Sequence, residues 1–313
     1  MDIVVVRGGA LGDCVVTLPA IHSLIQAVPE AARLCVIGSA HLQRLAVPDV
    51  FIDQGSAQCA WLFADDVDRR DAHGPSELLA AADLVLAYTP GGYDSALSRN
   101  LQSVCSGRLV PWDPRPSRAD HHIVDHLLQP LRQADIPTAT LTPQIEVLDD
   151  ERERGAALLP QPRPGQPLIL LHPGSGGAHK RWPLESFHEL AQHLASDGLC
   201  CAMVCGPVEI ETTHHLKHSQ AVPLIRHSSV PDLIALTAAA DLFVGNDSGP
   251  AHVAAAVGTP TITLFGPTNP AIWQPLAAHS RALHARGGQL DNLGVDFVRS
   301  TVLSVLSGEA DDR

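Results

Sequence analysis

The feature that most constrains the fold is an alternation of short apolar runs with helical patterns along all 313 residues. Ile3–Val6 is a continuous β-branched run that predicts a buried strand, and a helical stretch follows it to about Ala27. Further strand-like runs occur at Leu34–Ile37 and Leu84–Ala87. Strands that alternate with helices in this way indicate parallel sheets with helices on both faces. The sequence therefore predicts an α/β protein.

A composition break at Glu146–Pro167 divides this pattern into two similar halves. A charged run predicts a helix there, and a Pro-rich linker of the kind found at domain boundaries follows it. After the break the sequence predicts strands at Leu168–Leu171, Leu199–Val204, Leu242–Val244 and Thr261–Leu264, with helices at Leu184–Ala195, Val230–Ala239 and Gly249–Val257. We expect Rossmann-like domains at 1–160 and 161–294, and a closing helix within 295–313 that packs back towards the N-terminal domain.

Two prolines bear on helix geometry in the first half. Apolar side chains recur at helical spacing along His122–Gln129, and Pro130 should end or kink that helix. Pro19 lies within the first expected helix and predicts a kink or an irregular first turn.

Composition excludes several classes of protein. A formal net charge of −13 argues against nucleic-acid binding and against tight adhesion to an anionic membrane. Seven cysteines form no C-x-x-C pair, which indicates free thiols in a reducing compartment. No basic segment precedes an apolar stretch at the start, and no run of ~18 apolar residues occurs. We expect no signal peptide, no spanning helix and a cytoplasmic location.

The first loop that could carry chemistry is Arg7–Asp13, which directly follows the first strand. Ligands of open parallel sheets collect beyond the carboxyl ends of strands. The glycines of this loop match neither the dinucleotide fingerprint nor a P-loop, which disfavours a nicotinamide-dependent dehydrogenase. Asp13 has two interpretations, the N-cap of the following helix or a general base. From the residues alone, the N-cap is favoured.

The second loop, His172–Pro183, follows the first strand of the second half. Its backbone N–H groups and the Lys180–Arg181 pair could form a cradle for phosphate. A flexible surface loop with a solvated basic pair explains the same residues equally well. Pro173 occupies the first glycine position of a G-x-S-x-G elbow, which disfavours a serine hydrolase.

The third loop, Gly245–His252, lies between a strand and an Ala-rich helix. Asp247 or Ser248 is predicted to cap that helix, and Pro250 fits its first turn. The positive helix end and its bare N–H groups suit a diphosphate, which His252 could also reach. Capping and phosphate binding are compatible.

Histidine clusters suggest a metal site at first sight. His121, His122, Asp125 and His126 share one predicted helix, and another holds His214, His215 and His218. Neither cluster has a complete ligand set or an H-E-x-x-H pattern. Solvated helix faces explain them better, so we expect no metal and no cofactor.

Taken in order, these loops resemble glycosyltransferase family 9, the heptosyltransferase family, which has the GT-B fold. The matching stretches are Arg7–Ala20, His122–Leu131, Leu171–Pro183 and Asp241–Pro275, and the closing helix is also similar. The resemblance covers nearly the whole chain and is weakest at about Asp53–Trp112, where family members differ in their acceptors. It implies two Rossmann-like domains that face each other across a cleft.

The resemblance also implies an activity and a set of residues. Family members are inverting, metal-independent transferases that usually pass heptose from ADP-L-glycero-D-manno-heptose to the lipopolysaccharide inner core, which places them in the cytoplasm, including at the inner face of the inner membrane. Asp13 falls where the family's base lies, which shifts the balance towards that role. Lys180 matches the lysine that contacts the donor diphosphate, and Glu209 is in the loop that reaches the ribose. The other implied donor-binding residues are Gly12, Ser175, Gly176, Asp247, Ser248, Gly249 and His252.

Departures from the family leave the substrates open. The first half contains no lysine, so a basic surface for a phosphorylated acceptor is thin, and both donor and acceptor could differ from the usual ones. Gly91–Tyr93 and Arg99 are our candidates for an acceptor-side loop. A sugar-nucleotide epimerase of the same fold would need acid and base groups on both faces of the sugar, and no such set is visible. The presence of both Asp13 and Lys180 argues against an inactive binding protein.

Overall fold

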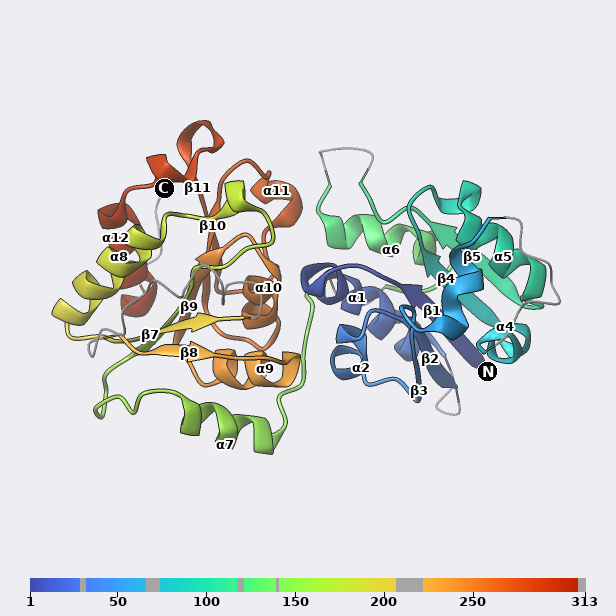
Figure 1. Cartoon of the computed structure of the whole chain (residues 1–313), viewed down its shortest axis with the longest axis horizontal. Coiled ribbons are helices and arrows are strands. Elements are labelled where there is room, and N and C mark those ends of the chain that lie inside the picture. Colours follow the sequence, from blue (N-terminus) through green and yellow to red (C-terminus); the bar gives the residue numbers. More distant parts are fainter. Residues whose placement is uncertain (29–31, 66–73, 117–120, 139–140, 207–221, 309–313) are drawn as a thin grey trace. The chain divides into compact units, whose positions relative to one another are not determined.

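The computed structural model describes residues 1–28, 32–65, 74–116, 121–138, 141–206 and 222–308 (Figure 1). The chain forms two compact units, Met1–Pro143 and Gln144–Arg313. Each unit has a parallel sheet with helices packed on it, which confirms the predicted α/β class. All seven cysteines are free. No helix in these ranges is both long enough and apolar enough to cross a bilayer.

The first unit is built on a five-stranded sheet in the order β3-β2-β1-β4-β5. Every pairing in it is parallel. The central strand β1 is almost entirely buried, as its β-branched run predicts. The strands are β1 (Asp2–Arg7), β2 (Arg33–Gly38), β3 (Val50–Asp53), β4 (Leu84–Tyr88) and β5 (Arg108–Trp112).

Pro19 and Pro130 both lie inside helices, and the expectation that Pro130 could end its helix is wrong. The helices are α1 (Leu11–Ala27), α2 (His41–Leu45), α3 (Ala60–Phe63), α4 (Ser76–Ala81), α5 (Ala96–Val104) and α6 (Ile123–Gln133). Pro130 does not end α6, which continues to Gln133. Its ring is buried, so packing offsets the backbone hydrogen bond that proline removes. Pro19 likewise lies inside α1.

The second unit is built on a six-stranded parallel sheet in the order β11-β10-β9-β6-β7-β8. Its strands are β6 (Leu168–His172), β7 (Cys200–Cys205), β8 (Leu224–Arg226), β9 (Leu242–Asn246), β10 (Thr261–Phe265) and β11 (Ser280–His284). Its helices are α7 (Asp149–Leu158), α8 (Leu184–Ser196), α9 (Val230–Ala238), α10 (Gly249–Ala256), α11 (Pro270–Trp273) and α12 (Val295–Ser307).

The boundary between the units lies earlier than the expected 160/161. Helix α7 belongs to the second unit because it packs closely on α9. At their crossing, a Cβ added to Gly155 would lie 2.0 Å from the carbonyl oxygen of Ala235. Only glycine allows that approach. The Pro-rich stretch therefore connects α7 to β6 within the second unit.

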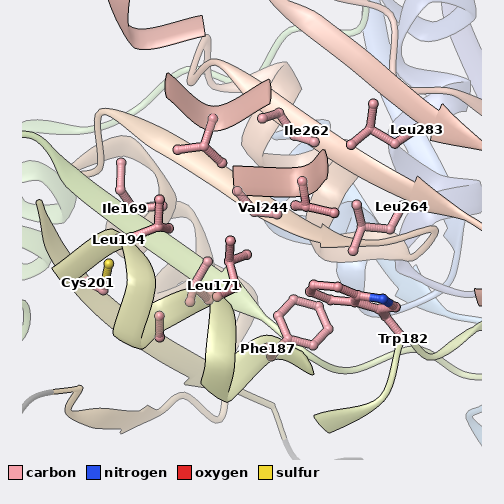
Figure 2. Close-up of a cluster of buried hydrophobic side chains, with 14 of the residues drawn as sticks. Ile169, Leu171, Trp182, Phe187, Leu194, Cys201, Val244, Ile262, Leu264 and Leu283 are labelled. Carbon is pink, nitrogen blue, oxygen red and sulfur yellow. The ribbon is translucent and has the colours of Figure 1, made fainter. Parts of the chain in front are cut away.

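Two layers of side chains cover the faces of the second sheet. One cluster contains Trp182 and Phe187, whose rings meet edge to face with centroids 5.0 Å apart (Figure 2). Trp182 also donates from Nε1 to the carbonyl of Leu293 at 2.9 Å. Val298 and Val302 of α12 are buried in the same cluster. The predicted closing helix is thus present, but its buried face belongs to the core of the second unit and not to the N-terminal domain towards which it was expected to pack.

Candidate functional site

Three loops meet at one edge of the second unit's sheet. They follow β6, β9 and β10, which are neighbouring parallel strands. The carboxyl ends of these strands therefore share that edge, where parallel sheets bind their ligands. Sequence reasoning singled out the first two loops, and the third contributes Thr268.

Lys180 and Asp247 form an ion pair between two of these loops. The ammonium Nζ of Lys180 lies 2.8 Å from Oδ2 of Asp247, and Thr268 donates its hydroxyl to the same oxygen at 2.6 Å. The side chain of Asp247 is 8% exposed and that of Lys180 is 29% exposed. The carboxylate is therefore held by two donors, and the ammonium is fixed beside it with part of its surface open to solvent.

Hydrogen bonds join the β6 and β9 loops below this pair. Asn246 donates to the carbonyl of Pro173 at 2.8 Å and accepts from the backbone N–H of Trp182 at 2.9 Å. The Ser175 hydroxyl is buried and donates to the carbonyl of Asp247 at 3.0 Å. Because these groups are buried and paired, they set the separation of the two loops.

Both basic side chains of the β6 loop contact other protein groups and are not simply solvated. Arg181 donates from Nε to the carbonyl of Ser175 at 2.8 Å, and Lys180 is paired with Asp247. These contacts argue against the interpretation as a flexible surface loop. Gly176 is exposed, and a Cβ added there would meet nothing within 4 Å. The protein itself does not require glycine at that position.

The amino end of α10 lies at the same edge of the second unit's sheet. Ser248 occupies the N-cap position, but its side chain makes no capping hydrogen bond and donates instead to the carbonyl of Asn246 at 3.1 Å. Asp247 points to Lys180, so Ser248 is the N-cap residue as predicted, but neither side chain makes the capping hydrogen bond. Pro250 lies in the first turn as expected. Gly249 begins the helix, and His252 is buried one turn in.

A second buried histidine, His172, ends β6 beneath the loop. It is 2% exposed, and its ring stacks on Phe243 at 6.2 Å. Burial, and after it the neighbouring His227, lower the pKa of His172 from 6.5 to about 3, against opposing hydrogen bonds of the Gly174 and His172 backbone. This imidazole is therefore neutral at ordinary pH.

In the first unit, Asp13 lies in the first turn of α1, as Gly12 does. The helix begins at Leu11 with Ala10 as N-cap, so Asp13 is not the N-cap residue that the sequence favoured. It occupies the third helical position, from which its Oδ2 accepts the N–H of Ala10 at 2.9 Å. Oδ1 lies 3.5 Å from the guanidinium of Arg7, and the side chain is 39% exposed. Asp13 thus stabilises the helix start with a carboxylate that solvent can still reach.

The turn into α1 depends on glycine. Gly9 has φ of +111°, a conformation that L side chains rarely adopt, and an added Cβ there would lie 2.8 Å from that of Asp13. Substitution at Gly9 would displace the carboxylate directly.

Contacts within the first unit hold the proposed acceptor-side residues. Gly91 has φ of +87° and donates its N–H to Asp113 at 2.9 Å. Arg99 pairs with Asp65 at 2.9 Å and donates to the carbonyl of Asp94, while its side chain remains 58% exposed. The Arg115 guanidinium holds the pKa of the Asp113 carboxyl well below its usual range. Sequence reasoning did not identify Asp113, because its importance depends on contacts between loops.

The histidine clusters have structural explanations where they are described. His122 is the N-cap of α6, and its ring nitrogen accepts the N–H of Val124, while His126 lies 2.8 Å from the carbonyl of Asp113 and 3.2 Å from the indole nitrogen of Trp112. The expectation of a solvated helix face is therefore wrong for both. The described residues contain no group of three or more candidate metal ligands. Glu209, His214, His215 and His218 lie outside the described ranges.

Comparison with protein families identifies the chain's relatives. A model of glycosyltransferase family 9 (heptosyltransferase) matches residues 108–293. Lipopolysaccharide heptosyltransferase 2 of Salmonella typhimurium is 30% identical over 159 residues, which cover 48% of this chain and 45% of that protein. The chain thus spans less than half the length of that curated relative.

Solved structures resemble the chain over almost its whole length. A family 9 glycosyl transferase from Veillonella parvula matches with a TM-score of 0.77 and 20% identity, covering 98% of this chain and 97% of that one. The ADP-heptose lps heptosyltransferase II of E. coli matches with a TM-score of 0.76 and 21% identity, covering 99% and 100%. At these identities the likeness shows the fold, and the predicted GT-B fold class is confirmed.

Proposed function

Because the chain belongs to glycosyltransferase family 9, the heptosyltransferase family, we propose that it transfers heptose from ADP-heptose to a lipopolysaccharide core or related envelope glycan. The family match supports the reaction class. The lipopolysaccharide heptosyltransferase relative supports the acceptor class, and the ADP-heptose enzyme of the same fold supports the donor.

The observation that carries this proposal is the cluster of Lys180, Asp247 and Thr268 beside the amino end of α10. Departure of a nucleoside diphosphate places negative charge on its phosphates. An ammonium group and a helix amino end stabilise that charge without a metal ion. Lys180 is held by Asp247, so its side chain is already ordered before the donor binds. Little of its conformational entropy is therefore lost on binding.

In this proposal four residues at the same edge line the diphosphate, with a histidine behind them. Ser175 and Gly176 of the β6 loop and Ser248 and Gly249 of the β9 loop line the diphosphate, with His252 behind them. The open space around Gly176 is room for the donor. Glu209 is proposed for the ribose by family resemblance, and Gly12 for the donor from the first turn of α1. Arg99 is the proposed acceptor contact.

Asp13 is the proposed general base. Its carboxylate is 39% exposed, which leaves it accessible to an acceptor hydroxyl. It removes the hydroxyl proton while the oxygen attacks the anomeric carbon and the bond to the diphosphate breaks. A single displacement of this kind inverts the anomeric centre and needs one carboxylate and no covalent intermediate. Because the acceptor is a growing glycolipid, we propose that the protein works in the cytoplasm at the inner face of the inner membrane.

Donor binding and transfer test the proposal. Thermal shift and calorimetry with ADP, UDP, GDP and NAD should show selective binding of ADP, and ADP-heptose should support transfer to a heptose-deficient core acceptor in the presence of EDTA. The anomeric configuration of the product, read by NMR, should be inverted. Selective binding of NAD, or loss of all transfer with EDTA, would contradict the proposal.

Lys180→Ala tests the diphosphate contact. The variant should weaken ADP binding about tenfold or more, because it removes a charged hydrogen-bond donor. Arg163→Ala is the matched control, because Arg163 is an exposed cation in the linker of the same unit. Equal ADP affinity in the wild type and Lys180→Ala would remove Lys180 from the site.

A further inference from the structure

The buried guanidinium of Arg7 lies next to the carboxylate of the proposed base. Arg7 ends β1 and is only 5% exposed. Its Nε donates to the hydroxyl of Thr17 at 3.0 Å, and its Nη2 donates to the carbonyl of Asp13 at 3.3 Å. The same Nη2 lies 3.5 Å from Oδ1 of the Asp13 carboxylate. A buried cation is costly unless it is paired, and Asp13 forms an ion pair with Arg7.

The arginine itself is also held by Tyr88 and Thr17. Its guanidinium carbon lies 5.7 Å from the ring centroid of Tyr88, whose hydroxyl donates to the carbonyl of Leu127 at 2.5 Å. The hydroxyl of Thr17 accepts a hydrogen bond from Arg7 and donates one to the carbonyl of Asp13 at 2.7 Å. The planar fork of donors is therefore fixed relative to the first turn of α1.

Asp13 is consequently held at both carboxylate oxygens. Oδ2 accepts the N–H of Ala10, and Oδ1 faces Arg7. The last torsion of an aspartate is broad and easily rotated, so one contact alone leaves its second oxygen free to swing. A hydrogen bond at Oδ2 and an ion pair at Oδ1 together restrict that rotation. The exposed fraction of the side chain shows that they do so without closing it off from solvent.

We propose that Arg7 is a positioning residue that acts through Asp13. It fixes the orientation of the Asp13 carboxylate towards the acceptor hydroxyl. This inference rests on the proposed function, in which Asp13 is the base. Proton removal requires the base within hydrogen-bond reach of the hydroxyl, and a misplacement of ~1 Å costs about a hundredfold in rate.

A double-mutant cycle on turnover tests this inference. Arg7→Met removes the donors while keeping a similar length of apolar chain. It should lower kcat by about tenfold to a hundredfold, with KM for donor and acceptor within about twofold, because the carboxylate acts in the transition state. In an Asp13→Asn background the same change should alter kcat less than about twofold, because the group through which Arg7 acts is already gone.

Arg7→Lys separates positioning from simple charge. Lysine keeps the cation but cannot present a planar fork, so its loss of kcat should lie between those of the wild type and Arg7→Met. If Arg7→Met does not fold, Arg7→Lys carries the cycle instead, with a loss in the wild-type background and none beside Asp13→Asn. Arg33→Met is the matched control, because Arg33 begins the neighbouring strand β2 and pairs with Asp2 at the opposite edge of the sheet. It should leave kcat unchanged.

The outcomes separate this inference from the proposed function. Asp13→Asn by itself reports on the base, and full activity in that variant overturns both the base and the positioning role of Arg7. If Asp13→Asn is impaired but Arg7→Met lowers kcat by the same factor in both backgrounds, the base stands and the inference about Arg7 is overturned. A rise in KM without a fall in kcat would also overturn it, because it would make Arg7 a binding group.

Discussion

Acid should lower the free energy of unfolding because of the buried His172. Replacement of His172 by leucine tests this prediction. Its pKa is about 3 in the folded protein against 6.5 when unfolded. Because the folded value is the lower one, the unfolded chain takes up the proton first, and stability is lost as pH falls through 6.5 towards 3. Between pH 7 and pH 5 this linkage removes about 2 kcal/mol of unfolding free energy, from 1.36 kcal/mol per pH unit and partial protonation at the upper limit.

Urea unfolding of the wild type and His172→Leu at pH 7 and pH 5 measures this contribution. The wild type should lose about 2 kcal/mol more than the variant over that interval, whatever their absolute stabilities. His279→Leu is the control, because that imidazole is exposed in the same unit, and it should follow the wild type. If the wild type and His172→Leu lose the same free energy between the two pH values, the buried imidazole is not the acid-sensitive group and the reasoning fails.

Three further substitutions test the packing of α7 and the proposed donor-binding loops. Gly155→Ala should lower the free energy of unfolding by about 1–3 kcal/mol, measured by urea denaturation, because its Cβ would lie 2.0 Å from the Ala235 carbonyl oxygen and force α7 off α9; unchanged stability would mean that α7 is free to shift. Gly176→Ala has no such neighbour within 4 Å, so stability should be unchanged while calorimetry shows weaker ADP binding. Equal ADP affinity there would place the diphosphate elsewhere. Thr268→Val should cost about 1–3 kcal/mol of unfolding free energy, because Asp247 loses a hydrogen bond; a smaller loss would show that water replaces the hydroxyl.

The sequence predicts the interior strands of both sheets and misses the edge strands. Runs such as Ile3–Val6 and Leu168–Leu171 are apolar throughout because both of their faces are covered by helices. The strands that escaped prediction are β3, β5, β8 and β11, and all four lie at sheet edges. Their residues are mostly half-buried or exposed, so no continuous apolar run marks them.

The site was predictable where local chemistry marks it. Glycine-rich loops after strands pointed to Lys180 and Asp247, and the two side chains are in contact. Thr268 comes from a third loop, and only the tertiary fold shows that it shares a carboxylate oxygen with Lys180. Asp13 could be predicted only in part. The sequence correctly placed a carboxylate at a helix start but could not tell the N-cap from the third helical position. The role of Arg7 could not be predicted, because it depends on contacts that join the end of one strand to a helix and to a neighbouring strand.

Transfer by Asp13→Asn is the most direct test of the proposed mechanism. Single-turnover transfer from ADP-heptose and calorimetric ADP binding would be measured on the same preparation. The mechanism predicts that the transfer rate falls by about a hundredfold or more, because a general base contributes on that scale, while ADP affinity stays within a few-fold of the wild type. A variant that transfers heptose at the wild-type rate would contradict it. So would one that loses ADP binding together with activity, because Asp13 would then serve only the structure of the helix start.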